Sequence, residues 1–292
     1  MKLSELLCAD TPVMVQGATG HAARRHMALM RRHGTNIVAG VSPGRAGEAV
    51  DGIDIHSTCA SARAASAAVI AIQFVPARHV AEAAREALES GIKLLVTVTE
   101  GVPVHDSARV MRFARERGAI WIGPSTPGIT IPGVIKLGFM PDVSLNPGPI
   151  GVMSKSGTLA YEVCHRLVRA GLGQSTWIGV GGDPGIGSVF VDLLALFEND
   201  EETEVVVLIG EIGGTDEEEA ATFIENEMNK PVVAFVAGRT APPGKQMGHA
   251  GAIVSGGMGT AQSKIKAFEK AGIPVAEMPA DIPNLVKGAL NR

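Results

Sequence analysis

The chain has 292 residues, of which 46% are hydrophobic and 19% are charged, and its formal net charge is -4. This length suggests two domains, and the composition is ordinary for a globular enzyme. The small negative charge argues against surfaces that bind nucleic acid or an anionic membrane. Three widely spaced cysteines form neither a disulfide framework nor a zinc pattern, which favours a reducing compartment. Because no long apolar segment or signal-type N-terminus is present, we expect no membrane span and a cytoplasmic location.

Short apolar runs alternate with helical patterns through the first half of the chain. Such runs, bounded by turn residues, are typical of parallel strands buried on both faces. Strands are predicted at 13–16, 37–40, 69–74, 94–99 and 120–123, and helices at 22–33, 78–90 and 106–117. This order predicts an open parallel α/β sheet in a first domain at residues 1–130.

The alternation stops within residues 123–149, which contain six Pro and five Gly. We therefore place a Pro/Gly-rich junction at 131–148 and a second domain at 149–292. In that domain, strands are predicted at 150–154, 175–180, 205–211 and 232–237, and helices at 158–170, 189–198, 216–228, 261–271 and 282–290. A Gly-rich loop at 238–259 separates the last strand from the last two helices. The second domain is thus also a doubly wound α/β sheet, whose ligands bind beyond the carboxyl ends of the strands.

The first predicted strand ends in a glycine-rich turn that opens a helix. Gly17 and Gly20 stand in a loose Gly-x-x-Gly-x-x-Ala pattern, in which the backbone can approach a phosphate at the helix N-terminus. The same pattern also occurs in ordinary strand–helix connections. Arg45 follows the second strand and could pair with a phosphate or be a solvated loop cation. No acidic residue closes the second strand where an NAD ribose would require one, which argues against a dehydrogenase.

Three features of the second domain suggest phosphate chemistry. Ser156, Gly157 and Thr158 open a helix after a strand, which suits either an anion site or an ordinary N-cap. Glu211 lies between glycines at the carboxyl end of a strand, so it either points into a cleft or is an exposed turn carboxylate. His249 lies among small residues of the Gly-rich loop, which leave room for a bulky group on its imidazole.

The Gly-rich loop also contains a near match to a nucleotide-binding loop. Gly238, Gly244 and Lys245 resemble that motif, but five residues separate the two glycines and Gln246 follows the lysine. The motif requires four intervening residues and a Ser or Thr that holds magnesium, so we reject the match. If phosphate chemistry occurs here, another chain supplies the nucleotide.

The sequence resembles the alpha subunit of succinyl-CoA synthetase (succinate–CoA ligase) from about residue 13 to residue 290. The matching blocks include Gln16-Gly17-x-Thr19-Gly20, Gly210-Glu211-Ile212-Gly213-Gly214 and Met247-Gly248-His249-Ala250-Gly251-Ala252. Several blocks in one order are far more specific than any single block. The resemblance implies a Rossmann-like CoA-binding domain followed by a flavodoxin-like ligase domain. It also implies reversible, nucleotide-driven formation of succinyl-CoA through a phosphohistidine and an acyl phosphate.

The resemblance further implies roles for individual residues. His249 would carry the phosphoryl group, Glu211 would steady it, and Tyr161 would contact the acid. Ser156, Gly157 and Thr158 would bind phosphate, and no metal would bind to this chain. CoA would contact Thr19, Gly20, His21, Ala22, Arg45, Val98, Thr99 and Glu100. An ATP-grasp beta subunit would supply ATP or GTP with Mg²⁺ and form a heterodimer or heterotetramer with this chain.

The sequence also departs from the family pattern in three places. His21-Ala22-Ala23-Arg24-Arg25 stands where the family usually has Ser-Gln-Gly-Thr-Phe, Arg45 replaces a lysine, and Ser125-Thr126 replaces Asn-Cys. These changes suggest a divergent member, with malate or another small carboxylate as an alternative to succinate. A non-catalytic CoA-binding protein is a second alternative, but it leaves Glu211 and His249 unexplained. A Rossmann oxidoreductase is the third, and tight NADH binding without CoA binding would favour it.

Overall fold

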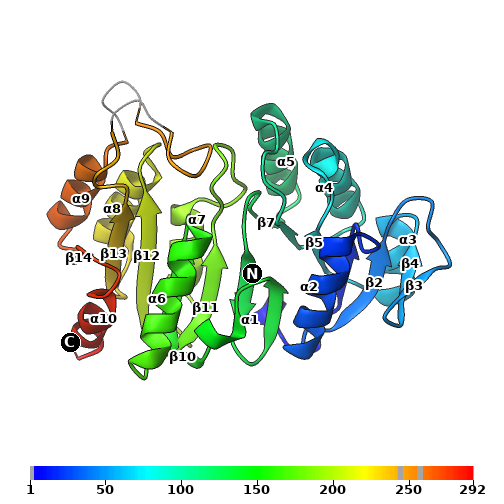
Figure 1. The fold of residues 1–292 in the computed structure, drawn as a ribbon, viewed down its shortest axis with the longest axis horizontal. Helices are drawn as coiled ribbons and strands as arrows, with labels where there is room; N and C mark the ends of the chain where they lie inside the picture. The colour runs from blue at the N-terminus through cyan, green and yellow to red at the C-terminus, as the bar shows by residue number, and fades with distance from the viewer. Residues whose placement is uncertain (1–2, 243–245, 255–258, 292) are drawn as a thin grey trace. The chain divides into compact units, whose positions relative to one another are not determined.

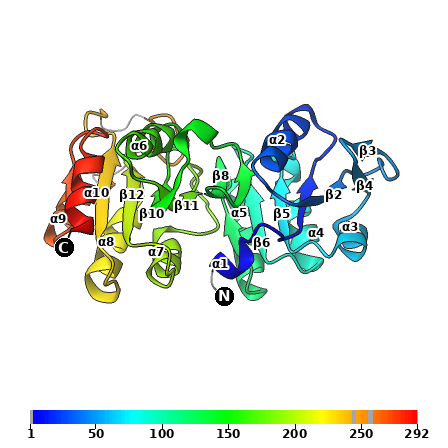
Figure 2. The same cartoon turned by 90° about the horizontal axis from the view of Figure 1, so that it is seen from below.

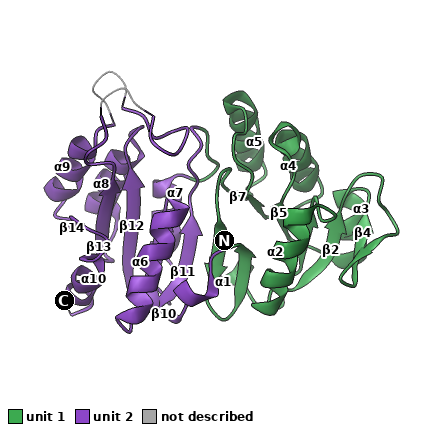
Figure 3. Cartoon of the chain, viewed as in Figure 1, with its two compact units in different colours: residues 1, 3–139, 185–188 green, residues 2, 140–184, 189–292 purple. Residues whose placement is uncertain are grey.

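The computed structural model describes residues 3–242, 246–254 and 259–291. The chain divides into two compact units (Figure 3). Unit 1 comprises Leu3–Phe139 with Gly185–Ser188, and unit 2 comprises Met140–Pro184 with Val189–Arg292. The segment that we expected to join two domains, residues 131–148, contains strand β9 (Ile135–Gly138) and a 3-10 turn, η2 (Asp142–Ser144).

Unit 1 is a mostly parallel sheet with the strand order β3-β4-β2-β1-β5-β6-β7. Its strands are β1 (Val13–Gln16), β2 (Ile37–Val41), β3 (Ala49–Val50), β4 (Ile53–His56), β5 (Ile70–Gln73), β6 (Leu94–Thr97) and β7 (Ile120–Ile122). Its helices are α1 (Leu3–Leu6), α2 (His21–Arg32), α3 (Cys59–Ser66), η1 (Ala77–His79), α4 (Val80–Glu89) and α5 (Val104–Glu116). Helices α3, α4 and α5 cover one face, and α2 covers the other, where it packs against the hairpin of β8 (Gly128–Ile131) and β9 (Figures 1 and 2).

The strand order reverses between β1 and β5. The chain runs from β1 outward through β2 and β4, and then returns to place β5 on the other side of β1. Loops that leave the two strands diverge at such a switch point, which opens a crevice beyond the carboxyl ends of the strands. The glycine-rich turn at 17–20 leaves β1 at this place.

Buried polar side chains link the carboxyl ends of the central strands of unit 1. The side-chain oxygen of Gln16 accepts a hydrogen bond from the side-chain amide of Gln73 at 2.8 Å. The side-chain oxygen of Gln73 in turn accepts from the Thr97 hydroxyl at 2.5 Å. Trp121 Nε1 donates to the Thr97 hydroxyl at 2.8 Å. Because a buried polar group without a partner is costly, these bonds fix the relative positions of four strand ends.

Unit 2 contains parallel strands in the order β14-β13-β12-β10-β11. The strands are β10 (Pro147–Ser154), β11 (Gln174–Gly179), β12 (Val205–Glu211), β13 (Val232–Ala237) and β14 (Val275–Ala276). The helices are α6 (Gly157–Arg169), α7 (Phe190–Glu198), α8 (Asp216–Glu227), α9 (Ala261–Lys270) and α10 (Ile282–Leu290). Helices α6 and α10 cover one face and α7, α8 and α9 the other (Figure 2). In order of first appearance the strands run 5-4-3-1-2, the flavodoxin-like arrangement.

Each unit has its own hydrophobic core with one buried tryptophan. Trp121 lies in the core of unit 1 beneath α4 and α5, together with Leu95 and Val110. Trp177 lies in the core of unit 2 with residues of β10, β12 and α6 such as Leu167. Two separate apolar cores explain why the chain forms two compact units.

Most elements predicted from the sequence are present within a few residues, and the predicted α/β class with a Rossmann-like and a flavodoxin-like sheet is confirmed. The sequence did not predict α1, β3, β4, α3, the β8–β9 hairpin or β14. Parts of the predicted Gly-rich loop, residues 243–245 and 255–258, lie outside the described residues, and so do Gly244 and Lys245 of the rejected nucleotide motif. Within the described part of the chain, every helix is too short or too polar to cross a bilayer.

Candidate active site

The switch point of unit 2 lies between β10 and β12. Strand β10 pairs with β12 on one side and with β11 on the other. The segment after β10 begins at Lys155 and the segment after β12 follows Glu211, so both leave the same edge of the sheet. This edge is where a doubly wound sheet binds its ligands.

His249 and Glu211 meet at this edge. Their Nδ1 and Oε2 atoms are 2.8 Å apart, although 38 residues separate them in the chain. The Glu211 side chain is 10% exposed and that of His249 is 26% exposed. When Nδ1 carries the proton, it donates to the carboxylate and leaves the lone pair of the ring on Nε2. The arrangement therefore selects one imidazole tautomer and provides a nucleophilic nitrogen.

Two glycines allow the His249 loop to approach closely the loops that follow β11 and β12. A Cβ atom at Gly182 would lie only 2.4 Å from Cγ of the His249 ring. At Gly213, where φ is +96°, a Cβ atom would lie 2.1 Å from the carbonyl oxygen of Gly251. The Gly251 N–H also donates to the Gly182 carbonyl at 3.2 Å. The absence of side chains at Gly182 and Gly213 thus permits the position of the histidine.

The start of α6 supplies N–H groups at the same edge. Ser156 is the N-cap, and its hydroxyl accepts from the Leu159 N–H at 3.4 Å. The Ser156 N–H donates to the Ser154 hydroxyl at 3.1 Å. The first-turn N–H groups of a helix have no acceptor within the helix, and the helix dipole favours an anion there. Gly157 and Thr158 lie in this first turn.

Beside this edge lies a cluster of buried charges that the sequence analysis did not find. Lys155 Nζ lies 2.9 Å from Asp216 Oδ2 and 3.1 Å from Glu217 Oε1. The Lys264 ammonium contacts Glu217 and lies 3.0 Å from Glu218 Oε2. Burial acts to lower the pKa of Lys155, but the Glu217 and Asp216 carboxylates outweigh it and raise that pKa above its usual value. Lysine and glutamate are usually exposed, so their sequence positions gave no sign of burial.

Tyr161 lies on α6 and packs against the core of unit 2. Burial raises the pKa of its phenol to about 12. The group therefore stays protonated and able to donate a hydrogen bond at any physiological pH.

Unit 1 contains a cavity of about 710 Å³ at its own switch point. Of the residues predicted to bind CoA, Thr19, Gly20 and Arg45 line it. Others do not: His21 and Ala22 begin α2, while Val98, Thr99 and Glu100 follow β6. The Thr99 hydroxyl nevertheless donates to the carbonyl of Val75, a lining residue, at 2.6 Å. The sequence analysis missed lining residues such as Ser42, Pro43, Pro76, His79 and Glu86.

The turn at the mouth of this cavity depends on one glycine. Gly17 has a φ of +75°, and a Cβ atom there would lie 2.8 Å from the carbonyl oxygen of Phe74. The Thr19 hydroxyl donates to Ser42 at 3.1 Å, which ties the turn to the end of β2. Arg45 is half exposed and pairs with Glu48 at 2.9 Å. The cavity therefore has a tight backbone wall at Gly17 and a half-exposed, ion-paired cation in its lining.

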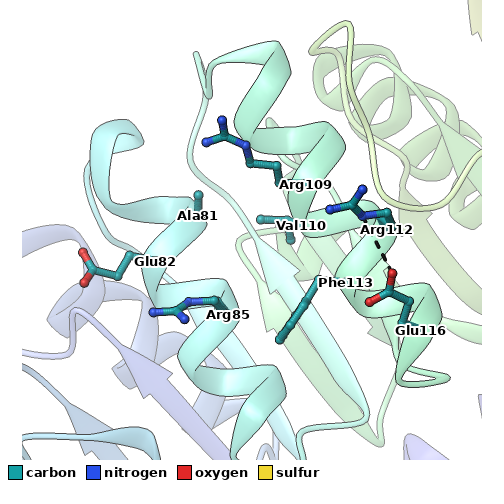
Figure 4. Close-up of a pocket in the computed structure, with 8 residues that line it drawn as sticks. All are labelled: Ala81, Glu82, Arg85, Arg109, Val110, Arg112, Phe113 and Glu116. Atoms are coloured by element: carbon teal, nitrogen blue, oxygen red, sulfur yellow. Dashed lines mark ion pairs between the residues drawn. The ribbon is translucent and has the colours of Figure 1, made fainter.

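A smaller groove of about 370 Å³ lies between α4 and α5 (Figure 4). Val110 and Phe113 form its apolar part, and Arg85, Arg109 and Arg112 extend from the two helices around it. Their ion pairs follow single helices, such as Arg112 with Glu116 at 3.7 Å, and exposed pairs of this kind contribute little. The groove contains none of the predicted site residues.

Among residues 3–242, 246–254 and 259–291, no three His, Cys, Asp or Glu side chains are arranged to bind a metal ion.

Two family models match the chain. A CoA binding domain covers residues 9–101, and a CoA-ligase domain covers residues 153–273. Subunit alpha 2 of the ADP-forming succinate–CoA ligase of Archaeoglobus fulgidus is 51% identical over 276 residues, which cover 94% of this chain and 96% of that protein. The chain belongs to the family of succinate–CoA ligase alpha subunits. The corresponding alpha subunit of Aquifex aeolicus is 48% identical over 283 residues, covering 96% of this chain and 93% of the relative.

A solved structure extends the comparison. ATP citrate lyase of Methanothrix soehngenii, in complex with citrate and coenzyme A, matches with a TM-score of 0.88 and 28% identity. The match covers 98% of this chain but only 50% of the lyase chain, so this chain spans half of that longer protein. The resemblance predicted from the sequence blocks is thus confirmed, and the family replaces the oxidoreductase alternative.

Proposed function

We propose that this chain is the alpha subunit of an ADP-forming succinate–CoA ligase in which His249 carries the phosphoryl group. The 2.8 Å contact between His249 Nδ1 and Glu211 Oε2 carries the proposal, because it prepares Nε2 as a nucleophile. Membership of the succinate–CoA ligase family supports the same reading. By family resemblance, an ATP-grasp beta subunit supplies ATP or GTP with Mg²⁺.

In the first step, Nε2 of His249 forms a bond to the terminal phosphorus of the nucleotide. The bond from that phosphorus to the bridging oxygen breaks, and the nucleoside diphosphate leaves with its electron pair. Glu211 keeps the proton on Nδ1 and offsets the positive charge that develops on the ring. The contact with the Glu211 carboxylate also orients the imidazole ring of His249 for this attack.

In the second step, a carboxylate oxygen of the acid takes the phosphoryl group from Nε2 and becomes an acyl phosphate. A free carboxylate resists a thiol because oxide is a poor leaving group, whereas phosphate leaves readily. CoA supplies the thiol that replaces phosphate and completes the thioester. We assign Ser156, Gly157 and Thr158 to hold the transferred phosphate at the N-terminus of α6. We assign the protonated Tyr161 phenol as a donor to the acid.

CoA fits the cavity of unit 1. Its volume of about 710 Å³ lies in the range of small-molecule sites. We assign Thr19 and Gly20, which line the cavity, and His21 and Ala22, which begin α2, to CoA. Arg45 offers a cation for a phosphate. Val98, Thr99 and Glu100 would contact the remainder of the molecule. We further propose that the complex is cytoplasmic. It is either a heterodimer or a heterotetramer, and light scattering of the purified complex distinguishes these two states.

The test uses the chain co-expressed with its beta subunit. After incubation with Mg²⁺ and ATP labelled at the terminal phosphate, the wild-type chain should carry acid-labile label. The His249→Ala variant should carry none and should form no thioester, yet still fold and bind CoA. His165→Ala, which removes another histidine of unit 2, serves as the matched control and should behave as wild type. Normal turnover by His249→Ala would disprove the mechanism.

The same preparation tests the identity of the acid. Succinate, malate and other small carboxylates are compared for CoA-dependent release of nucleoside diphosphate. Release with succinate above the others supports the proposal, and preferential release with another acid assigns the chain to a related ligase. Absence of acid-labile phosphate on the chain after incubation with its partner and Mg-ATP would instead favour a non-catalytic CoA-binding protein.

A further inference from the structure

We infer that Glu217 is a positioning residue: its buried carboxylate holds the backbone N–H of Glu211 and thereby aims the Glu211 side chain at His249. The inference rests on the proposed function of His249 as a phosphoryl carrier. Glu217 touches neither His249 nor the reacting atoms in this account, so its effect passes through Glu211.

The geometry around Glu217 is specific. The residue lies in the first turn of α8 and is 0% exposed. Its Oε1 atom accepts from the Glu211 N–H at 3.1 Å and lies 3.1 Å from Lys155 Nζ, while Oε2 contacts the ammonium of Lys264. A Cβ atom at Gly210 would lie 2.6 Å from Cγ of Glu217. Strand β12 therefore admits this side chain only because residue 210 is glycine.

At the end of β12, the Glu217 carboxylate takes the place of a backbone acceptor from a neighbouring strand. Strand β10 ends at Ser154, which pairs with Ile209, and the Lys155 N–H donates to the Ile209 carbonyl at 3.1 Å. The N–H of Glu211 lies beyond these last contacts with β10, and Glu217 accepts its hydrogen bond. The hydrogen bond that the Glu211 N–H donates to this fixed carboxylate positions the backbone from which the Glu211 side chain projects. Partners of this kind commonly decide how well a functional side chain is oriented.

Lys155 and Lys264 both pair with the Glu217 carboxylate. A fully buried carboxylate is costly unless it is paired and hydrogen-bonded, and Lys155 and Lys264 provide this pairing. Lys155 lies between Ser154 and Ser156, in the segment proposed to lead into the phosphate site. The cluster thus joins that segment to the strand end that carries Glu211. One buried carboxylate sets the relation between the two parts of the phosphoryl site.

The first experiment compares Glu217→Gln with Glu218→Gln in the complex with the beta subunit. Glu217→Gln keeps the volume but removes the charge that both lysines hold. We expect phosphorylation of His249 to slow by about ten- to a hundredfold, the range for lost orienting partners. Glu218→Gln also removes a contact of Lys264 but leaves the Glu211 N–H satisfied. It should phosphorylate at nearly the wild-type rate. A wild-type rate in Glu217→Gln overturns the inference.

A double variant separates positioning from a general loss of structure. If Glu217 acts through Glu211, the Glu211→Gln/Glu217→Gln variant should be no slower than Glu211→Gln alone, because the two effects are not additive. Multiplied effects overturn the inference. CoA affinity, measured by calorimetry, should be unchanged in all of these variants.

Gly210→Ala provides a second route if Glu217→Gln fails to fold. The added methyl group displaces Glu217 without changing any charge, so the same loss of phosphorylation is expected. A folded Gly210→Ala complex with the wild-type rate contradicts the inference. The wild-type complex distinguishes failure of the proposed function from failure of this inference. A wild-type complex that takes up no phosphate refutes the proposed function itself, and with it this role of Glu217.

Discussion

The two units position their candidate sites by different means. In unit 1 the site is shaped by close backbone packing and by neutral side chains. Gly17 brings the turn against Phe74, and side chains such as Gln16 and Gln73 link the strand ends. In unit 2 charged side chains dominate, from Glu211 to the buried Glu217 and its lysines. Both sites lie at the switch point of a doubly wound sheet. One kind of sheet thus suits both proposed tasks: shape suits the binding of a large ligand, and fixed charge suits phosphoryl transfer.

The sharpest test of this contrast is Gly182→Ala in unit 2. The new Cβ would overlap the His249 ring, 2.4 Å away, so the loop must move. Because a shift of about 1 Å in a reacting group can cost about a hundredfold, we expect a loss of phosphorylation of that order. Gly288→Ala, at a glycine of α10 with open space around it, is the control. Rapid-quench measurement of label uptake decides, and equal rates in both variants would show that the loop tolerates displacement.

Glu211→Gln should have the next largest effect. The amide keeps the size of the side chain but can no longer offset charge on the imidazole ring, so we expect phosphorylation to slow by about tenfold or more. CoA binding should be unaffected, since it belongs to unit 1. The exposed Glu219, which accepts from the Thr215 hydroxyl at 2.8 Å, gives the control variant Glu219→Gln. A rate equal to that of the control would remove Glu211 from the mechanism.

Gly17→Ala should produce the opposite pattern. Strain at a positive φ costs about 1–2 kcal/mol for a residue with a Cβ, so we expect CoA affinity to fall by about tenfold. Phosphorylation of His249 should proceed normally. Gly118→Ala introduces similar strain at a φ of +60° but in open space, and calorimetry should show unchanged CoA binding for it. Loss of phosphorylation in Gly17→Ala would mean that the two tasks are not separable.

The smallest expected effect is in the titration of Tyr161. Tyr161 is the only tyrosine of the chain, so the ultraviolet absorbance of phenolate reports it alone. Burial disfavours the charged form and raises the pKa of this phenol, so half-titration is expected at about pH 12 rather than near pH 10. Since the folded pKa is raised, this group's contribution to stability is complete below pH 10 and is lost as the pH rises toward 12. A midpoint near 10 in the folded chain would show that the phenol is not buried.

Much of the fold followed from local patterns. Strands β12 and β13 and helix α10 have the predicted limits because continuous apolar or amphipathic runs are bounded by turn residues. Strands β3 and β4 and helix α3 were missed because the Asp51-Gly52 turn and an alanine-rich stretch hide short elements. In β4, Ile53 and Ile55 are buried while Asp54 is exposed, an alternation too short to be distinguished from a loop.

Only part of the candidate site in unit 2 could likewise be predicted from the sequence. His249 and Glu211 could be singled out from the sequence because one lies in a Gly-rich loop and the other ends an apolar run. The structure shows them in contact, and the roles predicted for them remain predictions. Lys155, Glu217 and Lys264 could not be found, because charged residues are buried only where distant segments bring partners together. That information lies in the tertiary structure rather than in any local pattern.

The single tryptophan in the core of each unit has a practical consequence. The chain has two tryptophans, and both Trp121 and Trp177 are 2% exposed or less. A Trp121→Phe variant leaves fluorescence from unit 2 alone, and Trp177→Phe leaves it from unit 1 alone. Denaturation followed in the two variants would show whether the units lose their structure together or in sequence. Ligands added during such experiments would reveal which unit each of them protects.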